Sequence, residues 1–420
     1  MENKTKSLIT LAFALGLNAT AYAGTETAAA ATSDSNPGNW CEWLKNKPGL
    51  LHNDKENPWL QSFQIEGRFQ YQLGSVDGSD ANGNDFSETH EEYRRFRLGV
   101  KIDFLQYFSA KIVANLVNDA RNESVVGDLD WGYDSIDEAL LSIDIRKAFG
   151  AGPLDSLKLN YGRHKFVVGQ ETRASSTKLL TIERSAIANK VYGSYRPVGM
   201  SLDGAIDKWT FSGALYSSTT DGANNEEFSG WQDDVVYYAS AGYQVRDELR
   251  LGADLVYNHA DTISEDSVIG YRWATSINAE YNLESWGIIG DFIYGNNGGA
   301  DMTSTANRRS DFWGVIVMPY YWIVEDKLQL VGQYQYGGAD EAAGIRVNSR
   351  YGRAAGTGAA PDAYVNGGHG DQHHSFYTGL NYYLCGHNAK FQAGIEYQTM
   401  DTPIGDFDTL TYLIGFRTFF

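Results

Sequence analysis

The sequence predicts an all-β chain that crosses a membrane as a closed antiparallel barrel of about sixteen strands. Apolar and polar residues alternate with a period of two in segments of about ten residues. Short and long connections alternate between these segments, as in barrels with short periplasmic turns and long external loops. Beyond the N-terminus, no stretch approaches the ~18 uncharged apolar residues of a spanning helix. A barrel is the other structure that satisfies its backbone in lipid.

The N-terminus has the features of a cleavable secretory signal. Lys4 and Lys6 provide positive charge, residues 8–17 form a short apolar run, and an A-x-A site lies at 21–23. The apolar run is too short for a membrane anchor. We therefore expect residues 1–23 to be a signal peptide and the chain to be exported to the bacterial outer membrane.

The following segment, residues 24–60, does not alternate. It begins with an Ala/Thr/Ser-rich stretch and continues over 39–60 with a tryptophan-containing part. We expect a short helical or irregular lead-in on the periplasmic side. Residues 61–420 are then left for the barrel.

The C-terminal strand carries the clearest alternation. One face holds Leu410, Tyr412, Ile414, Phe416 and Phe420, and the other face is mainly small or polar. A last strand that ends in Phe is similar to the signal that outer-membrane barrels present to their assembly machinery. That machinery and the lipid of the outer membrane are therefore expected partners.

The same pattern recurs upstream and gives sixteen expected strands. They cover residues 62–74, 91–103, 108–118, 136–149, 156–168, 196–206, 209–218, 233–246, 249–260, 271–283, 286–296, 310–324, 328–338, 373–384, 389–399 and 409–420. The long connections between them are 75–90, 119–135, 169–195, 219–232, 297–309 and 339–372. An even number of strands places both ends of the barrel on the periplasmic side.

Charge is distributed unevenly along the chain. The net charge is −19, and loss of the signal peptide would change it to about −20, which argues against nucleic acid as a partner. Residues 158–196 nevertheless carry eight basic and two acidic side chains, for a net charge of +6. We expect the third long loop, 169–195, to fold into the lumen and present cations there, because rings of Arg and Lys select anions. The alternative is a solvated external loop whose basic residues pair with acidic neighbours.

Strand parity and this loop together give a set of expected pore-lining residues. Arg163 and Lys165 share the parity of apolar neighbours, so they reach the lumen only through a bulge or an inward bend. Acidic residues such as Glu66 and Asp254 also point inward, so the wall has mixed charge. The expected anion-binding residues are Arg68, Arg95, Arg97, Lys101, Lys111, Arg163, Lys165, Arg173, Lys178, Arg184, Lys190 and Arg196.

Four stretches resemble the phosphate-selective porin O/P family. They read YRRFRLG at 93–99, GRHK at 162–165, TRASSTKLLTIERS at 172–185 and RPVG at 196–199. The resemblance implies a sixteen-stranded, commonly trimeric barrel with an inward third loop and an arginine-lined path for small anions such as phosphate. It implies a porin, which needs no cofactor.

Cys41 and Cys385 are both expected to face the periplasm, one in the lead-in and one in a short turn. An oxidising compartment permits a disulfide between them, and two free thiols are the alternative.

The sequence is also compatible with other functions. A general diffusion porin without phosphate selectivity would show the same strands. A barrel enzyme would need a nucleophile beside a base, and the best pair is His164 with Ser175 or Ser176. An adhesive barrel would bind partners through its acidic loops.

Overall fold

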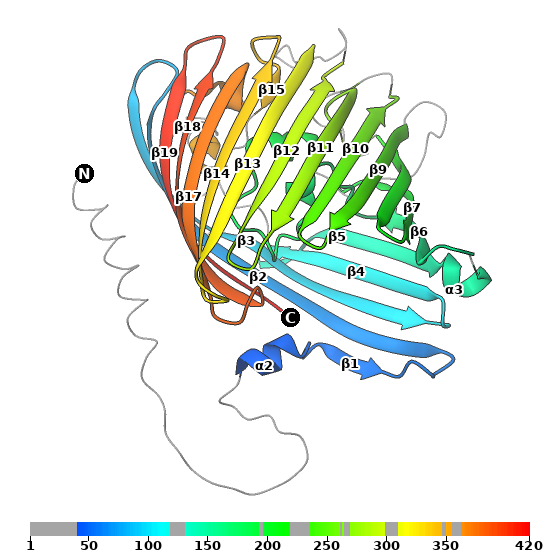
Figure 1. Cartoon of the computed structure of the whole chain (residues 1–420). Coiled ribbons are helices and arrows are strands. Elements are labelled where there is room, and N and C mark those ends of the chain that lie inside the picture. The colour runs from blue at the N-terminus through cyan, green and yellow to red at the C-terminus, as the bar shows by residue number, and fades with distance from the viewer. Residues whose placement is uncertain are drawn as a thin grey trace, which may run out of the picture. The chain divides into compact units, whose positions relative to one another are not determined.

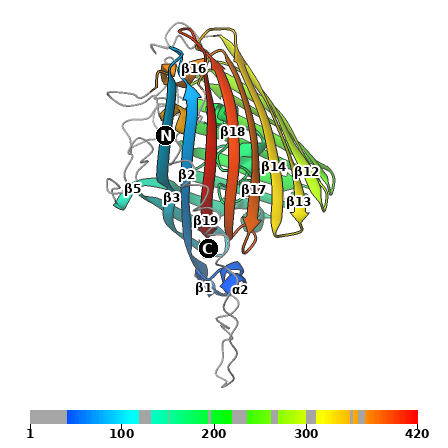
Figure 2. The ribbon, with the colours of Figure 1, turned by 90° about the vertical axis from the view of Figure 1, so that its left-hand side faces the viewer.

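A wall of sixteen antiparallel strands forms the main body of the chain (Figures 1 and 2). The computed structural model describes residues 40–117, 131–150, 152–192, 196–218, 235–260, 263, 269–298, 310–346, 350–354 and 363–420. Each wall strand pairs with its neighbours along the chain, β9 pairs with β10, and β19 pairs with β2. The sheet therefore closes on itself and has no open edge.

The wall strands follow the chain in order. They are β2 (Leu60–Ser79), β3 (Asp85–Phe104), β4 (Phe108–Val117), β5 (Trp131–Asp144), β6 (Ser156–Arg163), β7 (Val198–Ile206), β8 (Trp209–Ser217), β9 (Val235–Arg246), β10 (Leu249–Asn258), β11 (Trp273–Asn282), β12 (Trp286–Asn296), β13 (Asp311–Val324), β14 (Leu328–Ala339), β17 (Gln372–Tyr383), β18 (Ala389–Asp401) and β19 (Phe407–Phe419).

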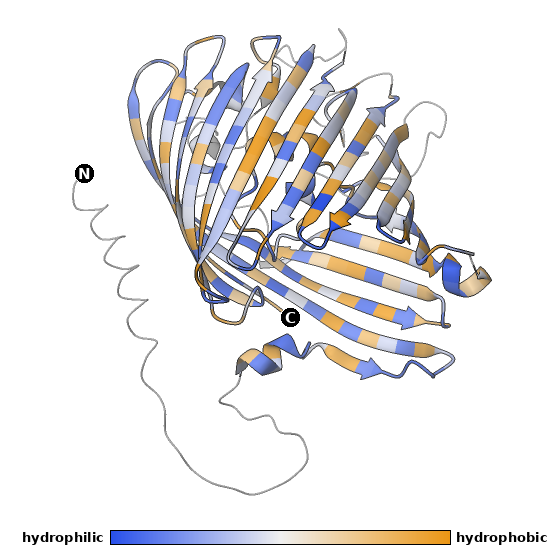
Figure 3. Cartoon of the chain, viewed as in Figure 1, coloured by the Kyte–Doolittle hydropathy of each residue, from blue (hydrophilic) through white to orange (hydrophobic). Residues whose placement is uncertain are grey.

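Hydropathy alternates along these strands, as Figure 3 shows by its bands of colour. On β11, Ile277 is 64% exposed and its neighbour Asn278 is 3% exposed. Apolar side chains thus point away from the barrel and polar ones point into it, the reverse of a soluble protein and the expected arrangement in lipid. No helix in the described ranges is long and apolar enough to cross a membrane.

The remaining described elements are short. They are α2 (Trp40–Lys45), β1 (Leu50–Asn53), α3 (Ile145–Phe149), α4 (Gln170–Arg173), α5 (Ala186–Tyr192), β15 (Ile345–Arg346), α6 (Arg350–Ala354), η2 (Asn366–Gly368) and β16 (His369–Gly370). β1 pairs with the start of β2, at Ser62–Gln64. The expected signal peptide, 1–23, and the adjoining residues up to 39 lie outside the described residues.

Several expected boundaries in the first half of the barrel are wrong. The expected loop 75–90 is mostly strand, because β2 and β3 continue to a tight turn at 80–84. The side chains there are mostly polar, so the hydropathy alternation stops although the backbone pairing continues. The expected strand 136–149 ends at Asp144, whose side chain caps α3 by accepting a hydrogen bond from Lys147 N at 3.0 Å. Gly150, with φ of 66°, ends that helix.

The expected strand 156–168 is also too long. Pairing of β6 with β7 stops at Arg163, opposite Val198. Residues 164–168 instead leave the wall, and Phe166 and Val168 are buried in the central apolar cluster. Their apolar character, which resembled that of a lipid-facing strand, reflects packing inside the protein.

A disulfide joins Cys41 of α2 to Cys385 in the turn between β17 and β18. Leu44 of α2 packs beside it against Ala389. The lead-in is therefore attached covalently to the turn end of the barrel.

Candidate functional site

The connection between β6 and β7 supplies a segment that we call the L3 segment, residues 164–192. It belongs to the third connection at the long-loop end of the barrel, counted from the turn between β2 and β3. Its apolar residues pack against inward-facing residues of the wall in one buried cluster. Phe166, for example, is 2% exposed and lies against Tyr216 and Tyr238, with ring centroids 6.0 and 6.3 Å apart.

The start of the L3 segment is held by carboxylates of β10 and β12. Asp254 accepts a hydrogen bond from Gly169 N at 2.9 Å, and Asp291 accepts one from Gln170 N at 2.7 Å. Gly169 has φ of +84°, and a Cβ there would lie 2.2 Å from the Asp291 carboxylate. Glycine at this position permits both the backbone conformation and the close approach.

Wall side chains on the other side of the barrel bind carbonyl groups in the middle of the segment. Gln70 of β2 donates to Ser176 O at 2.9 Å, and Asn381 of β17 donates to Leu180 O at 2.9 Å. Further donors to this stretch are Lys390, Gln392 and Arg417 from β18 and β19. Because these residues are buried polar groups, their bonds hold the segment at a defined place.

The end of the segment returns to β14 and β3. Ala186 N donates to Gln335 Oε1 at 2.7 Å. Glu183 Oε1 accepts a hydrogen bond from Arg94 Nε at 2.7 Å. Burial alone would raise the pKa of Glu183, but the guanidinium groups of Arg94 and Arg350 hold it well below its usual range. The segment thus has contacts with strands that lie around much of the wall.

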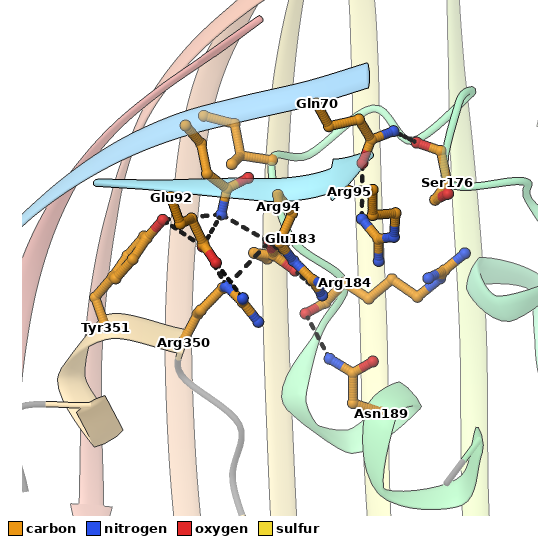
Figure 4. A network of polar contacts seen from close by, with 12 residues as sticks. Gln70, Glu92, Arg94, Arg95, Ser176, Glu183, Arg184, Asn189, Arg350 and Tyr351 are labelled. Carbon is orange, nitrogen blue, oxygen red and sulfur yellow. Dashed lines mark hydrogen bonds and ion pairs between the residues drawn. The ribbon is translucent and has the colours of Figure 1, made fainter. Parts of the chain in front are cut away.

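A β-bulge in β3 brings two consecutive arginines to the same face. Gln70 pairs with Arg95 and Tyr71 pairs with Tyr93, so Arg94 has no partner residue across β2. An extra residue in one strand breaks the side-chain alternation. Arg94 and Arg95 therefore both point into the barrel, where Arg94 binds Glu183 and Arg95 Nη1 donates to Gln70 Oε1 at 2.8 Å (Figure 4).

Several cationic side chains of this region have no ion pair with a carboxylate among the described residues, and among them are Arg68, Arg95, Lys165 and Arg184. Their partners are neutral. Arg68 donates to Ser176 Oγ at 2.7 Å, and Arg184 donates to Ala174 O at 2.8 Å. Lys165 donates to carbonyl oxygens of the same segment. We call these four residues the uncompensated cations.

Other expected cations are neutralised by carboxylates. Arg97 and Arg196 both bind Asp137, at 2.7 and 2.8 Å, and Arg196 also binds Glu138 at 2.9 Å. Lys111 lies 2.9 Å from Glu138 and 3.2 Å from Glu66. Arg173 is paired with Asp254. These pairs therefore add little net charge to the lumen.

The remaining expected residues are scattered. Lys101 lies on the inward row, in register with Gln64 and Lys111. Arg163 ends β6 on the row of the exposed Tyr161, as its parity indicated. Lys178 is exposed on the L3 segment. Lys190 donates to Asn297 Oδ1 at 2.7 Å and lies 4.1 Å from the ring centroid of Phe312.

Sequence reasoning missed several interior cations. Lys390 and Arg417 lie on the inward rows of β18 and β19, and strand parity could have found both. Arg94 could not be found in this way because the bulge reverses its direction. Arg350 lies in a long connection without alternation, so no periodic signal pointed to it.

The serine and histidine considered as a catalytic pair have other partners. His164 Nε2 lies 3.1 Å from Tyr216 OH, and His164 Nδ1 lies 2.9 Å from Gly162 O. Ser176 Oγ accepts the hydrogen bond from Arg68.

The comparisons with known proteins agree with this architecture. The family model for phosphate-selective porin O and P matches residues 63–289. Among curated proteins, no sequence matches the chain.

Solved barrels share the fold at low sequence identity. The outer membrane channel DcaP of Acinetobacter baumannii is 11% identical with a TM-score of 0.55, covering 87% of this chain and 100% of that one. An anion-selective porin from Comamonas acidovorans is 11% identical with a TM-score of 0.54, covering 86% and 99%. A loop-deletion mutant of OmpT from Vibrio cholerae is 12% identical with a TM-score of 0.54, covering 85% and 99%.

Proposed function

The chain belongs to the phosphate-selective porin O and P family, and we propose from this premise that it conducts small anions, phosphate among them, by passive diffusion. Family and fold indicate a channel of the bacterial outer membrane. The anion preference is our inference, and a signal peptide over 1–23 is part of it because the channel must be exported. On this proposal the protein is not an enzyme and needs no cofactor.

The observation that carries the proposal is the set of uncompensated cations. Arg68 and Arg95 project from the wall, and Arg184 and Lys165 belong to the L3 segment, where Lys165 is charged mainly below its pKa of about 6. We infer that the L3 segment narrows the lumen and that these four side chains border the part of the lumen through which anions pass. In a narrow, low-dielectric passage the field of these charges is focused.

The cations replace part of the hydration of an anion. Their guanidinium and ammonium groups are already held by neutral partners, so a passing anion can bind without first breaking an ion pair. Binding must remain weak for the anion to leave. Further expected contributors are Lys101 and Lys178, which are not ion-paired with a carboxylate in the part of the chain that the structure describes.

Oligomerisation is a separate part of the proposal. One structure of OmpT from Vibrio cholerae is described as a trimer form, with a TM-score of 0.50 and 11% identity to this chain. We propose a homotrimer for this chain on the basis of the shared fold.

A general diffusion porin is the second candidate. Asp137, Glu138 and Glu66 line the same region and neutralise three of the cations. A wall with balanced charge would discriminate weakly between ions.

The reversal potential of the purified protein in a planar bilayer under a KCl gradient separates these two candidates. We expect anion preference, and we expect added phosphate to reduce the chloride current. In Arg95→Gln the ratio of anion to cation permeability should fall about twofold, because one charge near the path changes the ion energy by about 0.4 kcal/mol or more. Arg246→Gln, at the exposed end of β9, is the matched control. Cation preference of the unmodified protein would exclude the anion channel.

A further inference from the structure

A cavity lies inside the barrel, where the end of the L3 segment meets the wall formed by β14, β17, β18 and β19. Residues of α6, in the long connection between β14 and β17, line another side of it. Tyr377, Glu396 and Thr411 stand in register on three neighbouring wall strands and line it together. The charged residues that line the cavity are Glu183, Arg184, Arg350 and Glu396.

Two of these four charged groups belong to a balanced network (Figure 4). The Arg350 guanidinium binds both oxygens of Glu92 on β3, and Arg350 Nε lies 3.7 Å from Glu183 Oε1. Glu183 Oε1 also binds Arg94 Nε at 2.7 Å. Two guanidinium groups therefore balance two carboxylates, and these directional pairs hold α6 beside the L3 segment.

The other two charged groups are not balanced. Glu396 accepts a hydrogen bond from Ser375 Oγ at 2.7 Å and has no ion pair among the described residues. Arg184 is one of the uncompensated cations, and its guanidinium donates to Ala174 O at 2.8 Å. No ion pair joins Arg184 to Glu396 in the described part of the chain, although both line the cavity. One positive and one negative group therefore border the same space without binding each other.

A buried hydroxyl group next to Glu396 is also unsatisfied. Thr411 is 2% exposed, and its Oγ1 has no hydrogen-bond partner among the described residues. Thr411 lies directly across from Glu396 in the pairing of β18 with β19, on the same face of the sheet. A buried polar atom without a partner calls for a polar occupant. The carboxylate and the hydroxyl together offer oxygen acceptors to a donor that carries positive charge.

The size of the cavity limits what can enter it. The cavity has room for a group about as large as one or two water molecules. An ammonium group is of this size, its N–H groups are donors only, and its charge is opposite to that of Glu396. A whole organic solute is larger, so only one end of such a solute enters.

We propose that the cavity binds the ammonium end of a small zwitterion while Arg184 binds the carboxylate end of the same solute. Amino acids are solutes of this class. Each end then meets an opposite charge that the described residues leave unbalanced, whereas a solute of one sign is attracted by one group and repelled by the other. The inference goes beyond anion conduction and rests on the proposed function only in placing Arg184 beside the path. Binding must be weak for the solute to leave.

Permeation of two isomers tests this site. β-Alanine is a zwitterion, and lactamide has the same atomic composition without ionised groups. Liposomes that contain the purified protein are placed in each solute at neutral pH, and the swelling rate is measured after subtraction of the rate without protein. We expect β-alanine to enter at least about twofold faster, because two charges near the path attract it. Equal rates would overturn the proposal.

Two variants assign the two ends of the solute. Glu396→Gln retains the length of the side chain and removes the negative group, and Arg184→Gln removes the positive group. Each should bring the two swelling rates close together. Asp203→Asn makes the same charge change as Glu396→Gln on the inward face of β7, outside the cavity, and should leave the difference unchanged. Loss of the difference in Glu396→Gln alone would overturn the assignment of the carboxylate end. Heat-modifiable migration on gels identifies the variants that fold.

Block of the chloride current is a second measurement that requires no variant. β-Alanine bound at Arg184 should reduce the current of the unmodified protein in a planar bilayer. Lactamide at the same concentration should reduce it less, because it has no carboxylate to bind the guanidinium. Equal reductions by the two isomers would contradict the site.

The two proposals fail in different ways. A protein without anion preference that still distinguishes β-alanine from lactamide would contradict the proposed function and support the zwitterion site. An anion-selective protein that does not distinguish the two isomers would overturn the zwitterion site and leave the anion channel intact.

Discussion

Arg97 of β3 and Asp137 of β5 form an ion pair across the intervening strand, with 2.7 Å between Nη1 and Oδ2. Their side chains are only 14% and 10% exposed. Two residues earlier, Arg95 donates to the neutral amide of Gln70. Arginines that look equivalent in the sequence therefore differ in whether a carboxylate balances their charge.

Removing the carboxylate of Asp137 should strengthen anion preference. Asp137→Asn leaves Arg97 without a carboxylate partner and leaves Arg196 with Glu138 alone. We expect the ratio of anion to cation permeability to rise about twofold, measured as reversal potential. Asp326→Asn is the control, because Asp326 lies in an exposed turn at φ of 55°, a conformation that Asn tolerates. A decrease in the ratio would contradict the assignment of these cations to the path.

Neutralising Arg184 should have the opposite effect. Arg184 has no carboxylate partner among the described residues, so Arg184→Gln removes an uncompensated charge and should lower the permeability ratio about twofold. The double variant Arg173→Gln, Asp254→Asn removes an ion pair without changing the net charge. Because Asp254 also holds the start of the L3 segment through Gly169 N, this variant should change the ratio, if at all, by less than Arg184→Gln does. Equal changes in both variants would mean that the L3 segment does not act through net charge.

Lys165 should make the selectivity depend on pH. Burial, together with the nearby guanidinium groups of Arg184 and Arg196, lowers the pKa of Lys165 to about 6. The amine is then mostly neutral at pH 7 and gains its positive charge as the pH falls through the pKa. Anion preference should therefore rise on acidification from about pH 7.5 to about pH 5. Lys165→Met should lose this rise, and a rise that persists in this variant would assign it to other groups.

Reduction of the disulfide should release the lead-in and leave the barrel intact. Cys41 links α2 to the turn at Cys385, whereas the wall is closed by sixteen strand pairings. After reduction we expect proteases to cleave the chain between α2 and β2, while the heat-modifiable band of the barrel is retained. Limited proteolysis with and without reductant measures this. Cys41→Ser with Cys385→Ser should be insensitive to reductant, and loss of the barrel band on reduction would contradict the prediction.

Strand parity predicted the inward direction of Arg68, Arg95 and Arg97, because a strand inside lipid must alternate apolar and polar side chains. Strand parity gave wrong predictions for residues outside the part of the wall that faces lipid. The polar ends of β2 and β3 are paired backbone beyond the apolar part of the strands, and the residues of α3 follow a cap at Asp144. The bulge at Arg94 cannot be recognised from the hydropathy pattern, because Arg94 and its neighbour Arg95 are both arginine.

The sequence predicts the position of the L3 segment only in part. Its apolar residues, such as Ile182 and Ile187, indicated that it packs on something, and the charge of 158–196 indicated cations. Neither observation shows which wall residues receive it. Lys390 and Arg417 bind carbonyl groups of the segment from strands more than two hundred residues away.

The amino-acid sequence by itself determined that this chain forms an antiparallel barrel. One face of the wall meets lipid and the other meets the polar lumen, so apolar and polar residues alternate with a period of two along each strand. The tertiary structure decided which cations have a carboxylate nearby that balances their charge. Ion pairs depend on distance, and barrel closure together with the path of the long loops brings Arg350 to Glu92 across 258 residues and leaves Arg95 beside an amide.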